Sequence, residues 1–254
     1  MKDLLENKTI IVTGAAGGIG KAAALVLAGH GANVVVTDIS ETGQDVASEI
    51  TAAGGSAAFV HADVTEDESA GELVAKALET FGRLDGAFNN AGIEQQSKPL
   101  HELSPAEWDR AIRVNLTGIF NCLRHEVKAM LDSGGGAIVN TASAMGSVAV
   151  ANAAEYVATK HGVIGLSRAA AVDYGTQGIR VNAVLPGVIE TPMFTRFAND
   201  PAYAGFIDQL RGQHPIGRFG RPEEIGQVVS WLLSDLSSFT TGAAIAADGG
   251  YLAI

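Results

Sequence analysis

The chain lacks the features that define several classes of protein. Cys122 is its only cysteine, which excludes an intrachain disulfide, and we expect a buried, unreactive thiol in a reducing compartment. The longest apolar run in a helical stretch, Ala22 to Ala28, is too short to cross a bilayer. The N-terminal residues include acids and no apolar core, so we expect no secretory signal and a cytoplasmic location.

Basic residues and metal-ligand patterns are also scarce. The 17 Lys and Arg residues are outnumbered by 28 Asp and Glu residues, giving a formal net charge of −11. We therefore expect no nucleic-acid partner and no membrane partner. No histidines are paired at metal-ligand spacing, so we predict no catalytic metal and interpret all of them as surface or core residues: His30, His61, His101, His125, His161 and His214.

Strand and helix signals alternate along all 254 residues, with no repeat and no linker that would divide the chain. This alternation predicts an α/β fold in one domain, residues 1–254, with a doubly wound parallel sheet of about seven strands and helices on both faces. The expected strands are Thr9–Thr13, Asn33–Asp38, Ala57–Asp63, Leu84–Asn89, Ala137–Thr141, Arg180–Leu185 and Ala243–Ala247.

Several helix starts can be read from capping residues. Thr65 with Glu68, and Ser104 with Glu107, have the spacing of capping boxes. Pro222 is typical of a first helical position and precedes an apolar stripe that we interpret as core. These signals predict three helix N-termini.

A glycine-rich turn, Thr13–Gly20, joins the first expected strand to the first helix. Gly14, Gly18 and Gly20 would let the backbone approach a pyrophosphate, and amide groups around Ile19 would face its charge. The spacing is not the common G-x-G-x-x-G, and a purely structural tight turn is the alternative. The position between strand and helix favours dinucleotide binding and a Rossmann-type sheet.

Asp38 ends the second expected strand, 18 residues after Gly20. A carboxylate there accepts hydrogen bonds from the adenosine ribose hydroxyls and repels the additional phosphate of NADP. Ile39 and Ser40 follow, so no neighbouring arginine is offered to that phosphate. The alternative is a solvated loop carboxylate, but the pattern favours NAD as the cofactor.

Tyr156 and Lys160 are four positions apart on an expected helix and share a face. Ser143 follows an expected strand, which would bring its hydroxyl to the carboxyl edge of the sheet, where ligands bind. A lysine ammonium at ~4 Å would stabilise the tyrosine phenolate by roughly 4 kcal/mol and lower its pKa by roughly three units. The pattern therefore predicts acid/base catalysis by Tyr156.

Together these motifs resemble the short-chain dehydrogenase/reductase family of single-domain type. The resemblance implies that Tyr156 is the acid/base, that Ser143 hydrogen-bonds the substrate oxygen and that Lys160 also binds the nicotinamide ribose. It implies that Asn115 holds a water in a proton relay to the lysine. The motifs span essentially the whole chain: Thr13–Gly20, Asp63-Val64, Asn89–Gly92, Asn115, Ser143, Tyr156-x-x-x-Lys160 and Pro186-Gly187 with Thr191.

The resemblance also implies further cofactor contacts, each with a structural alternative. Asp63 could simply end a strand, and Asn115 could be a polar residue within a helix. Asn89 is interpreted as structural, through turn hydrogen bonds. The implied NAD-binding residues are Asp63 and Val64 at the adenine, Asn90 in the cleft, and Pro186, Gly187, Val188 and Thr191 at the carboxamide, beside Tyr156 and Lys160.

The leading hypothesis is an NAD-dependent alcohol dehydrogenase or ketone reductase that transfers hydride directly between nicotinamide and a secondary alcohol carbon. One alternative is a reductase of carrier-linked 3-oxoacyl groups, which Asp38 and the acidic composition disfavour. Another is a non-catalytic NAD-binding protein, which the presence of Ser143, Tyr156 and Lys160 disfavours.

The irregular segment Gly187–Pro215 is predicted to be a substrate lid. Its apolar side chains favour a small, neutral, hydrophobic alcohol or ketone, although they could instead pack the lid against the body or a neighbouring subunit. They are Met193, Phe194, Phe197, Tyr203, Phe206, Ile207 and Leu210, with only scattered arginines at Arg196, Arg211 and Arg218.

The helix after Tyr156 carries small residues close to one face, which would let a second helix approach or would rest on the sheet. The family resemblance implies a homotetramer with 222 symmetry. The small residues are Ala158, Gly162, Gly165 and Ala169, and the chain ends in the apolar Tyr251–Ile254.

Overall fold

The computed structural model describes residues 3–191, 194–195 and 204–254. In these residues one parallel sheet has the strand order β3-β2-β1-β4-β5-β6-β7, with a crossover between its two halves. The order confirms the predicted doubly wound sheet, and no predicted strand boundary is off by more than two residues. The strands are β1 (Thr9–Thr13), β2 (Asn33–Asp38), β3 (Ser56–His61), β4 (Gly86–Asn89), β5 (Gly136–Thr141), β6 (Ile179–Pro186) and β7 (Ala244–Ala247).

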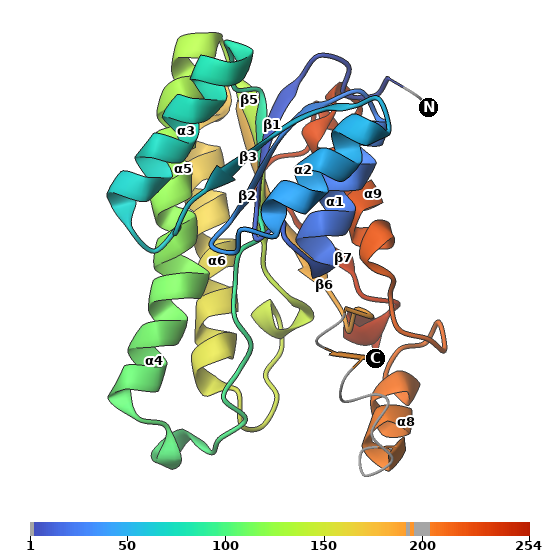
Figure 1. Ribbon diagram of the computed structural model, residues 1–254. Helices are drawn as coiled ribbons and strands as arrows, with labels where there is room; N and C mark the ends of the chain where they lie inside the picture. The colour runs from blue at the N-terminus through green and yellow to red at the C-terminus, as the bar shows by residue number, and fades with distance from the viewer. Residues whose placement is uncertain (1–2, 192–193, 196–203) are drawn as a thin grey trace.

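Helices cover both faces of the sheet (Figure 1). Buried side chains of α1, α2 and α9 form one core against it, and those of α3, α5 and α6 form a second core on the other face. The bounds are α1 (Gly18–Gly29), α2 (Gly43–Ala52), α3 (Asp67–Phe81), α4 (Pro105–Ile112), α5 (Gly118–Ser133), α6 (Ala154–Tyr174), α8 (Ala204–Gly212) and α9 (Pro222–Leu233).

The central strands are buried on both faces, which explains why their sequences are continuously apolar rather than alternating. In β1, Ile10 and Val12 contribute to the core of α1, α2 and α9, whereas Ile11 contributes to the opposite core. All five residues of β1 are buried. Parallel pairing with β2 on one side and β4 on the other fixes the register of β1 and places its carboxyl end.

Two of the three predicted helix starts are confirmed and one is wrong. Ser104 and Glu107 form a capping box at α4, and α9 begins at Pro222. Helix α3, however, begins at Asp67, and no side chain caps its N-terminus. The Thr65 amide instead donates to the Asp63 carboxylate at 2.9 Å, which closes a local turn just before the helix.

Of the predicted lid, the described helix α8 lies beyond the carboxyl ends of the strands, on the side opposite to α4 (Figure 1). Phe194 packs edge-on against Phe219 with ring centroids 4.8 Å apart, and Ile207 is buried, whereas Phe206 is exposed. Phe194 thus packs the predicted lid segment against Phe219. Met193, Arg196, Phe197 and Tyr203 lie outside the described residues.

Candidate active site

The glycine turn lies between β1 and α1 as predicted. Gly14 and Gly18 have φ angles of +65° and +54°, which favour glycine. A Cβ on Gly20 would lie 2.1 Å from the Gly14 carbonyl oxygen, whereas one on Gly17 would meet nothing within 4 Å. The turn therefore packs tightly on its inner side and is open at Gly17, as a surface that receives a pyrophosphate must be.

The Asp38 carboxylate braces this turn from the end of β2. It accepts a hydrogen bond from the Ala16 amide at 3.0 Å and another from the Ser40 amide at 2.9 Å. Each carboxylate oxygen retains acceptor capacity, so the group can also accept from a ribose hydroxyl. The nearby Lys21 ammonium is in an ion pair with Glu49 at 2.8 Å.

Thr13 and Asn90 tie the turn to the end of β4. The Thr13 hydroxyl accepts from the Asn90 and Ala91 amides at 3.0 and 3.1 Å, and the Asn90 side chain donates to the Thr13 and Gly14 carbonyls. A Cβ on Gly14 would lie 2.8 Å from the Ala91 Cα. Asn90 therefore holds the glycine turn against the end of β4 through hydrogen bonds, a role that its position in the sequence did not indicate.

The predicted adenine residues, Asp63 and Val64, lie in the connection between β3 and α3. The Asp63 amide donates to the Ser69 hydroxyl at 3.0 Å, and its carboxylate closes the turn before α3. Val64 is buried, and its carbonyl accepts from the Asn121 side chain at 2.9 Å. Both residues are held firmly, although the strand-end alternative proposed for Asp63 describes its observed bonds equally well.

Ser143, Tyr156 and Lys160 come together beside the carboxyl end of β5. The Lys160 ammonium is buried, donates to the Thr141 carbonyl at 2.7 Å and lies 5.4 Å from the centroid of the Tyr156 ring. The Ser143 hydroxyl accepts from the Met145 amide at 3.2 Å and lowers the pKa of Tyr156. The structure thus places the predicted hydroxyl, phenol and ammonium in one group.

The electrostatics of this group differ from the expectation. Burial raises the pKa of Tyr156 to about 12, the hydrogen bond with Ser143 lowers it, and the charge of Glu94 raises it. Burial lowers the pKa of Lys160 to about 8. The expected lowering of the Tyr156 pKa by the lysine is therefore wrong for the chain alone, because burial dominates.

Asn115 lies in a π-helical turn, Arg113–Thr117, between α4 and α5. Its side chain is fully buried; it accepts from the Ile93 amide at 2.7 Å and donates to the Ile93 carbonyl at 2.9 Å. These two bonds engage both side-chain groups. They fix the orientation of the side chain, and π-turns of this kind recur at functional sites.

The predicted carboxamide segment, Pro186–Thr191, follows β6 and faces the glycine turn. A Cβ on Gly18 would lie 3.4 Å from the Thr191 methyl group, which places the two loops side by side. The Val188 amide donates to Nε2 of His214 at 3.2 Å, and Nδ1 of this buried imidazole donates to the Leu210 carbonyl at 3.0 Å. His214 therefore links α8 to the segment.

Sequence reasoning missed three residues around the site. His214 was grouped with the other histidines as surface or core. Glu155 is buried, and one carboxylate oxygen accepts from the Gln96 amide at 2.6 Å. Glu94 belongs to the same loop and acts on Tyr156 through its charge. An acid directly before the catalytic tyrosine was the one signal in the sequence that could have indicated Glu155.

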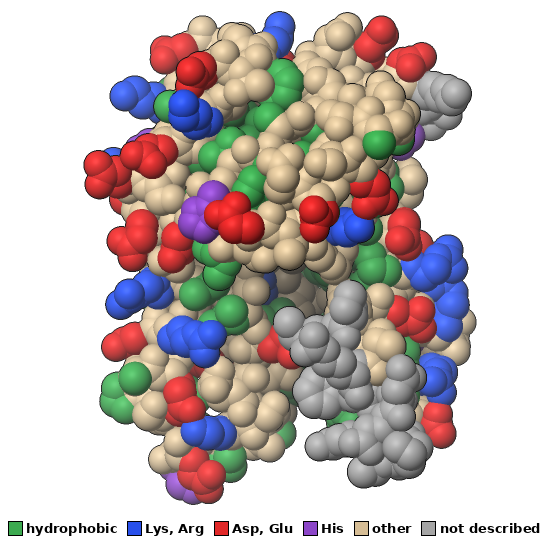
Figure 2. Space-filling view, in the orientation of Figure 1, with side chains coloured by type: hydrophobic (Ala, Val, Ile, Leu, Met, Phe, Trp, Pro, Cys, Tyr) green, Lys and Arg blue, Asp and Glu red, His purple; other side chains and the backbone are tan. Residues whose placement is uncertain are grey.

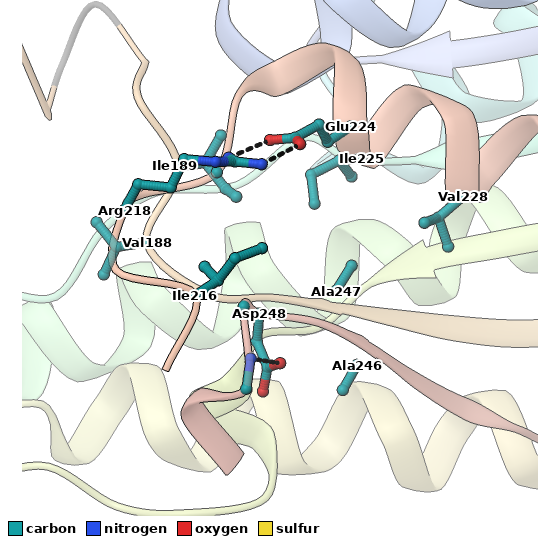
Figure 3. A pocket seen from close by; sticks show the side chains of 13 residues that line it. Val188, Ile189, Ile216, Arg218, Glu224, Ile225, Val228, Ala246, Ala247 and Asp248 are labelled. Atoms are coloured by element: carbon teal, nitrogen blue, oxygen red, sulfur yellow. Dashed lines mark hydrogen bonds and ion pairs between the residues drawn. The ribbon is translucent and has the colours of Figure 1, made fainter. Parts of the chain in front are cut away.

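A pocket of about 370 Å³ lies elsewhere, between α9 and the end of β7 (Figure 3). Apolar side chains such as Ile225 and Val228 line it, and the Arg218–Glu224 ion pair lies above them. Of the predicted site residues only Val188 borders this pocket. It contains none of the predicted catalytic residues.

The molecular surface agrees with the acidic composition. Figure 2 shows acidic and basic side chains interspersed over one face, which is hollowed near its centre. Within the described ranges, no three His, Cys, Asp or Glu residues are grouped so that they could hold a metal ion. In the same residues, no helix is both long and apolar enough to span a bilayer.

Comparison with known proteins extends these observations. Residues 14–252 match the family model described as Enoyl-(Acyl carrier protein) reductase. The chain is 49% identical over 252 residues to a 2,5-dichloro-2,5-cyclohexadiene-1,4-diol dehydrogenase of Sphingobium indicum, covering 98% of this chain and 99% of the relative. It belongs to the short-chain dehydrogenase/reductase family.

Other relatives of this family are similar over the same length. A cyclohexanol dehydrogenase of an Acinetobacter species is 47% identical, with 99% of this chain and 97% of the relative covered. The crystal structure of a levodione reductase superposes with a TM-score of 0.91 at 37% identity, covering 98% and 99% of the two chains. The chain is thus an oxidoreductase that interconverts secondary alcohols and ketones, as the site predicts.

Proposed function

We propose that this member of the short-chain dehydrogenase/reductase family uses NAD(H) to interconvert neutral ring alcohols and the corresponding ketones. The observation that carries the proposal is the convergence of Ser143, Tyr156 and Lys160 beside an open glycine turn. The relatives named for cyclohexanol and for a cyclohexadienediol support a ring as the substrate skeleton.

The chain's own residues perform the proton transfer. In ketone reduction, the Tyr156 hydroxyl gives its proton to the carbonyl oxygen, while Ser143 donates a hydrogen bond to the same oxygen. In alcohol oxidation, the Tyr156 phenolate takes the proton of the substrate hydroxyl, and the Lys160 ammonium stabilises that phenolate. A nicotinamide bound beside these residues would supply the hydride chemistry, as acceptor in alcohol oxidation and as donor in ketone reduction.

Several residues fit such a cofactor. The open glycine turn would receive the pyrophosphate, and Pro186–Thr191 would receive the carboxamide. The Asp38 carboxylate supports NAD over NADP, because it is fixed by two amides where the adenosine ribose would lie. Lys21, already in an ion pair with Glu49, offers little counter-charge to a 2′-phosphate.

The residues expected to line the substrate site favour a neutral substrate. The residues from Ala144 through Ala154 are mostly small and apolar, with Met145 the one large side chain in that stretch. A carrier-linked 3-oxoacyl substrate would bring an acidic partner protein, which the net charge of −11 disfavours. The family-model description names an acyl-carrier reductase, so thioesters belong among the substrates tested.

A homotetramer forms part of the same proposal. On α6, a Cβ on Gly165 would meet nothing within 4 Å, and the Val172 side chain is 82% exposed. Phe120 on α5 is also exposed, as is the C-terminal Ile254. These apolar groups would be covered by neighbouring copies, and light scattering that showed only a monomer at micromolar concentration would contradict the assembly.

The decisive experiment measures NADH and NADPH absorbance with cyclohexanol, cyclohexanone, aryl-alkyl ketones and a 3-oxoacyl thioester. We expect kcat/KM to be highest for ring substrates and higher with NAD(H) than with NADP(H). A preference for the thioester would contradict the substrate proposal, and a preference for NADP(H) would contradict the cofactor proposal.

A further inference from the structure

The loop Gly92–Gln96 runs along the first turn of α6, beside the catalytic pair. At its start, a Cβ on Gly92 would lie 3.8 Å from the Lys160 ammonium nitrogen. The next residue, Ile93, is held by two hydrogen bonds to the Asn115 side chain, at 2.7 and 2.9 Å. The loop therefore begins directly over the ammonium group.

The other end of the loop is held just as firmly. The Gln96 amide donates to the Glu155 carboxylate at 2.6 Å, and Glu155 immediately precedes Tyr156. Because Glu155 is buried, this anchor is shielded from water. The intervening Glu94 is consequently confined to the edge of the reaction centre.

Glu94 itself has no structural task in this arrangement. Among the described residues, no hydrogen bond or ion pair to its carboxylate is present, and the side chain is exposed. Backbone bonds of Ile93 and Gln96 already hold the loop. Gly92 lies beside Lys160 and Gln96 is bonded to Glu155, which keeps Glu94 at the edge of the reaction centre, and its charge raises the pKa of Tyr156.

We propose that Glu94 selects ring substrates that carry a second hydroxyl group, by accepting a hydrogen bond from that hydroxyl while Tyr156 serves the reacting oxygen. Cyclic diols and hydroxyketones are then the preferred substrate class, and rings that carry a carboxylate are repelled. This inference rests on the proposed function, because it assigns the substrate class of the same cleft.

The test compares kcat/KM for cyclohexanol, cyclohexane-1,3- and 1,4-diol, and 4-hydroxycyclohexanecarboxylate. The variants are Glu94→Ala, Glu94→Gln and, as a control, Glu72→Gln on the exposed side of α3, which removes the same charge away from the site. Loss of a hydrogen bond to a charged acceptor predicts a fall of about 10- to 100-fold in the diol-to-cyclohexanol ratio in Glu94→Ala.

Glu94→Gln keeps a hydrogen-bond acceptor without the charge, so the diol-to-cyclohexanol ratio of kcat/KM should fall less than in Glu94→Ala. The kcat/KM for 4-hydroxycyclohexanecarboxylate should rise by about tenfold or more, because the repulsion between two carboxylates is removed. The Glu72→Gln control should leave every ratio unchanged. Wild-type activity on cyclohexanol with no diol preference, or an unchanged ratio in Glu94→Ala, would overturn the inference and leave the proposed function standing. Absence of activity on every ring alcohol would overturn both.

Discussion

Glu126 on α5 provides the sharpest test of the physical reasoning. Its carboxyl group is fully buried between the sheet and α5, and one oxygen accepts from the Asn89 side-chain amide at 2.9 Å. The other oxygen of Glu126 and the Asn89 carbonyl oxygen are both buried without a partner. A proton on Glu126 would let these two oxygens hydrogen-bond, so the neutral acid is the form that fits.

Burial accordingly raises the pKa of Glu126 from 4.5 to about 7, with the Asn89 hydrogen bond acting in the opposite direction. Because the folded state binds the proton more tightly than the unfolded state, this group stabilises the fold most at low pH. The contribution is lost as the pH rises through the folded pKa. Between pH 5 and pH 8 the two pKa values imply a loss of about 2.5 kcal/mol in the free energy of unfolding.

Glu126→Gln is the matched perturbation. Its amide can donate to the Asn89 carbonyl and accept from the Asn89 amide at every pH, as the protonated acid does. Urea unfolding at fixed protein concentration, from pH 5 to pH 8, should show the variant gaining stability relative to wild type by about 2.5 kcal/mol over that range. Glu72→Gln should show no such trend. If the difference in the free energy of unfolding between wild type and Glu126→Gln stays constant with pH, Glu126 is not protonated beside Asn89 and the reasoning is refuted.

Three further outcomes are expected. Tyr156→Phe should lower kcat by more than about 10²–10⁴-fold while NADH fluorescence titration shows nearly unchanged binding; retention of a tenth of wild-type kcat would contradict the mechanism. Asp38→Ala combined with Ile39→Arg should shift kcat/KM toward NADP, and a wild type that already prefers NADP would contradict the assignment. His214→Ala removes the acceptor of the Val188 amide and should raise the KM for NADH more than it lowers kcat; an unchanged KM would show that His214 does not position that segment.

The sheet and the principal site residues could be predicted because their signals are local. The β1 run of β-branched residues and the glycines after it are adjacent in sequence, and Tyr156 and Lys160 lie one helical turn apart. Such patterns follow from backbone periodicity and turn conformation, which depend on a few neighbouring residues. The strand boundaries and the position of the glycine turn were therefore predicted nearly as observed.

Local signals failed where two residues compete for the same backbone group. Thr65 and Glu68 have capping-box spacing, but the Asp63 carboxylate takes the Thr65 amide and the helix starts at Asp67. The pKa of Tyr156 failed as an expectation for a different reason. Its value depends on burial by the whole fold, and one lysine at an assumed distance cannot represent that environment.

The sequence by itself determined the order of strands and helices, the turn that suits a dinucleotide and the helix that carries Tyr156 and Lys160. Only the tertiary structure decided which distant groups support them: Gln96 with Glu155, Val188 with His214, and Asn89 with Glu126. These partners lie 59, 26 and 37 positions apart in the chain. No periodicity connects such residues, because only packing of the helices against the sheet brings their polar atoms within hydrogen-bond distance.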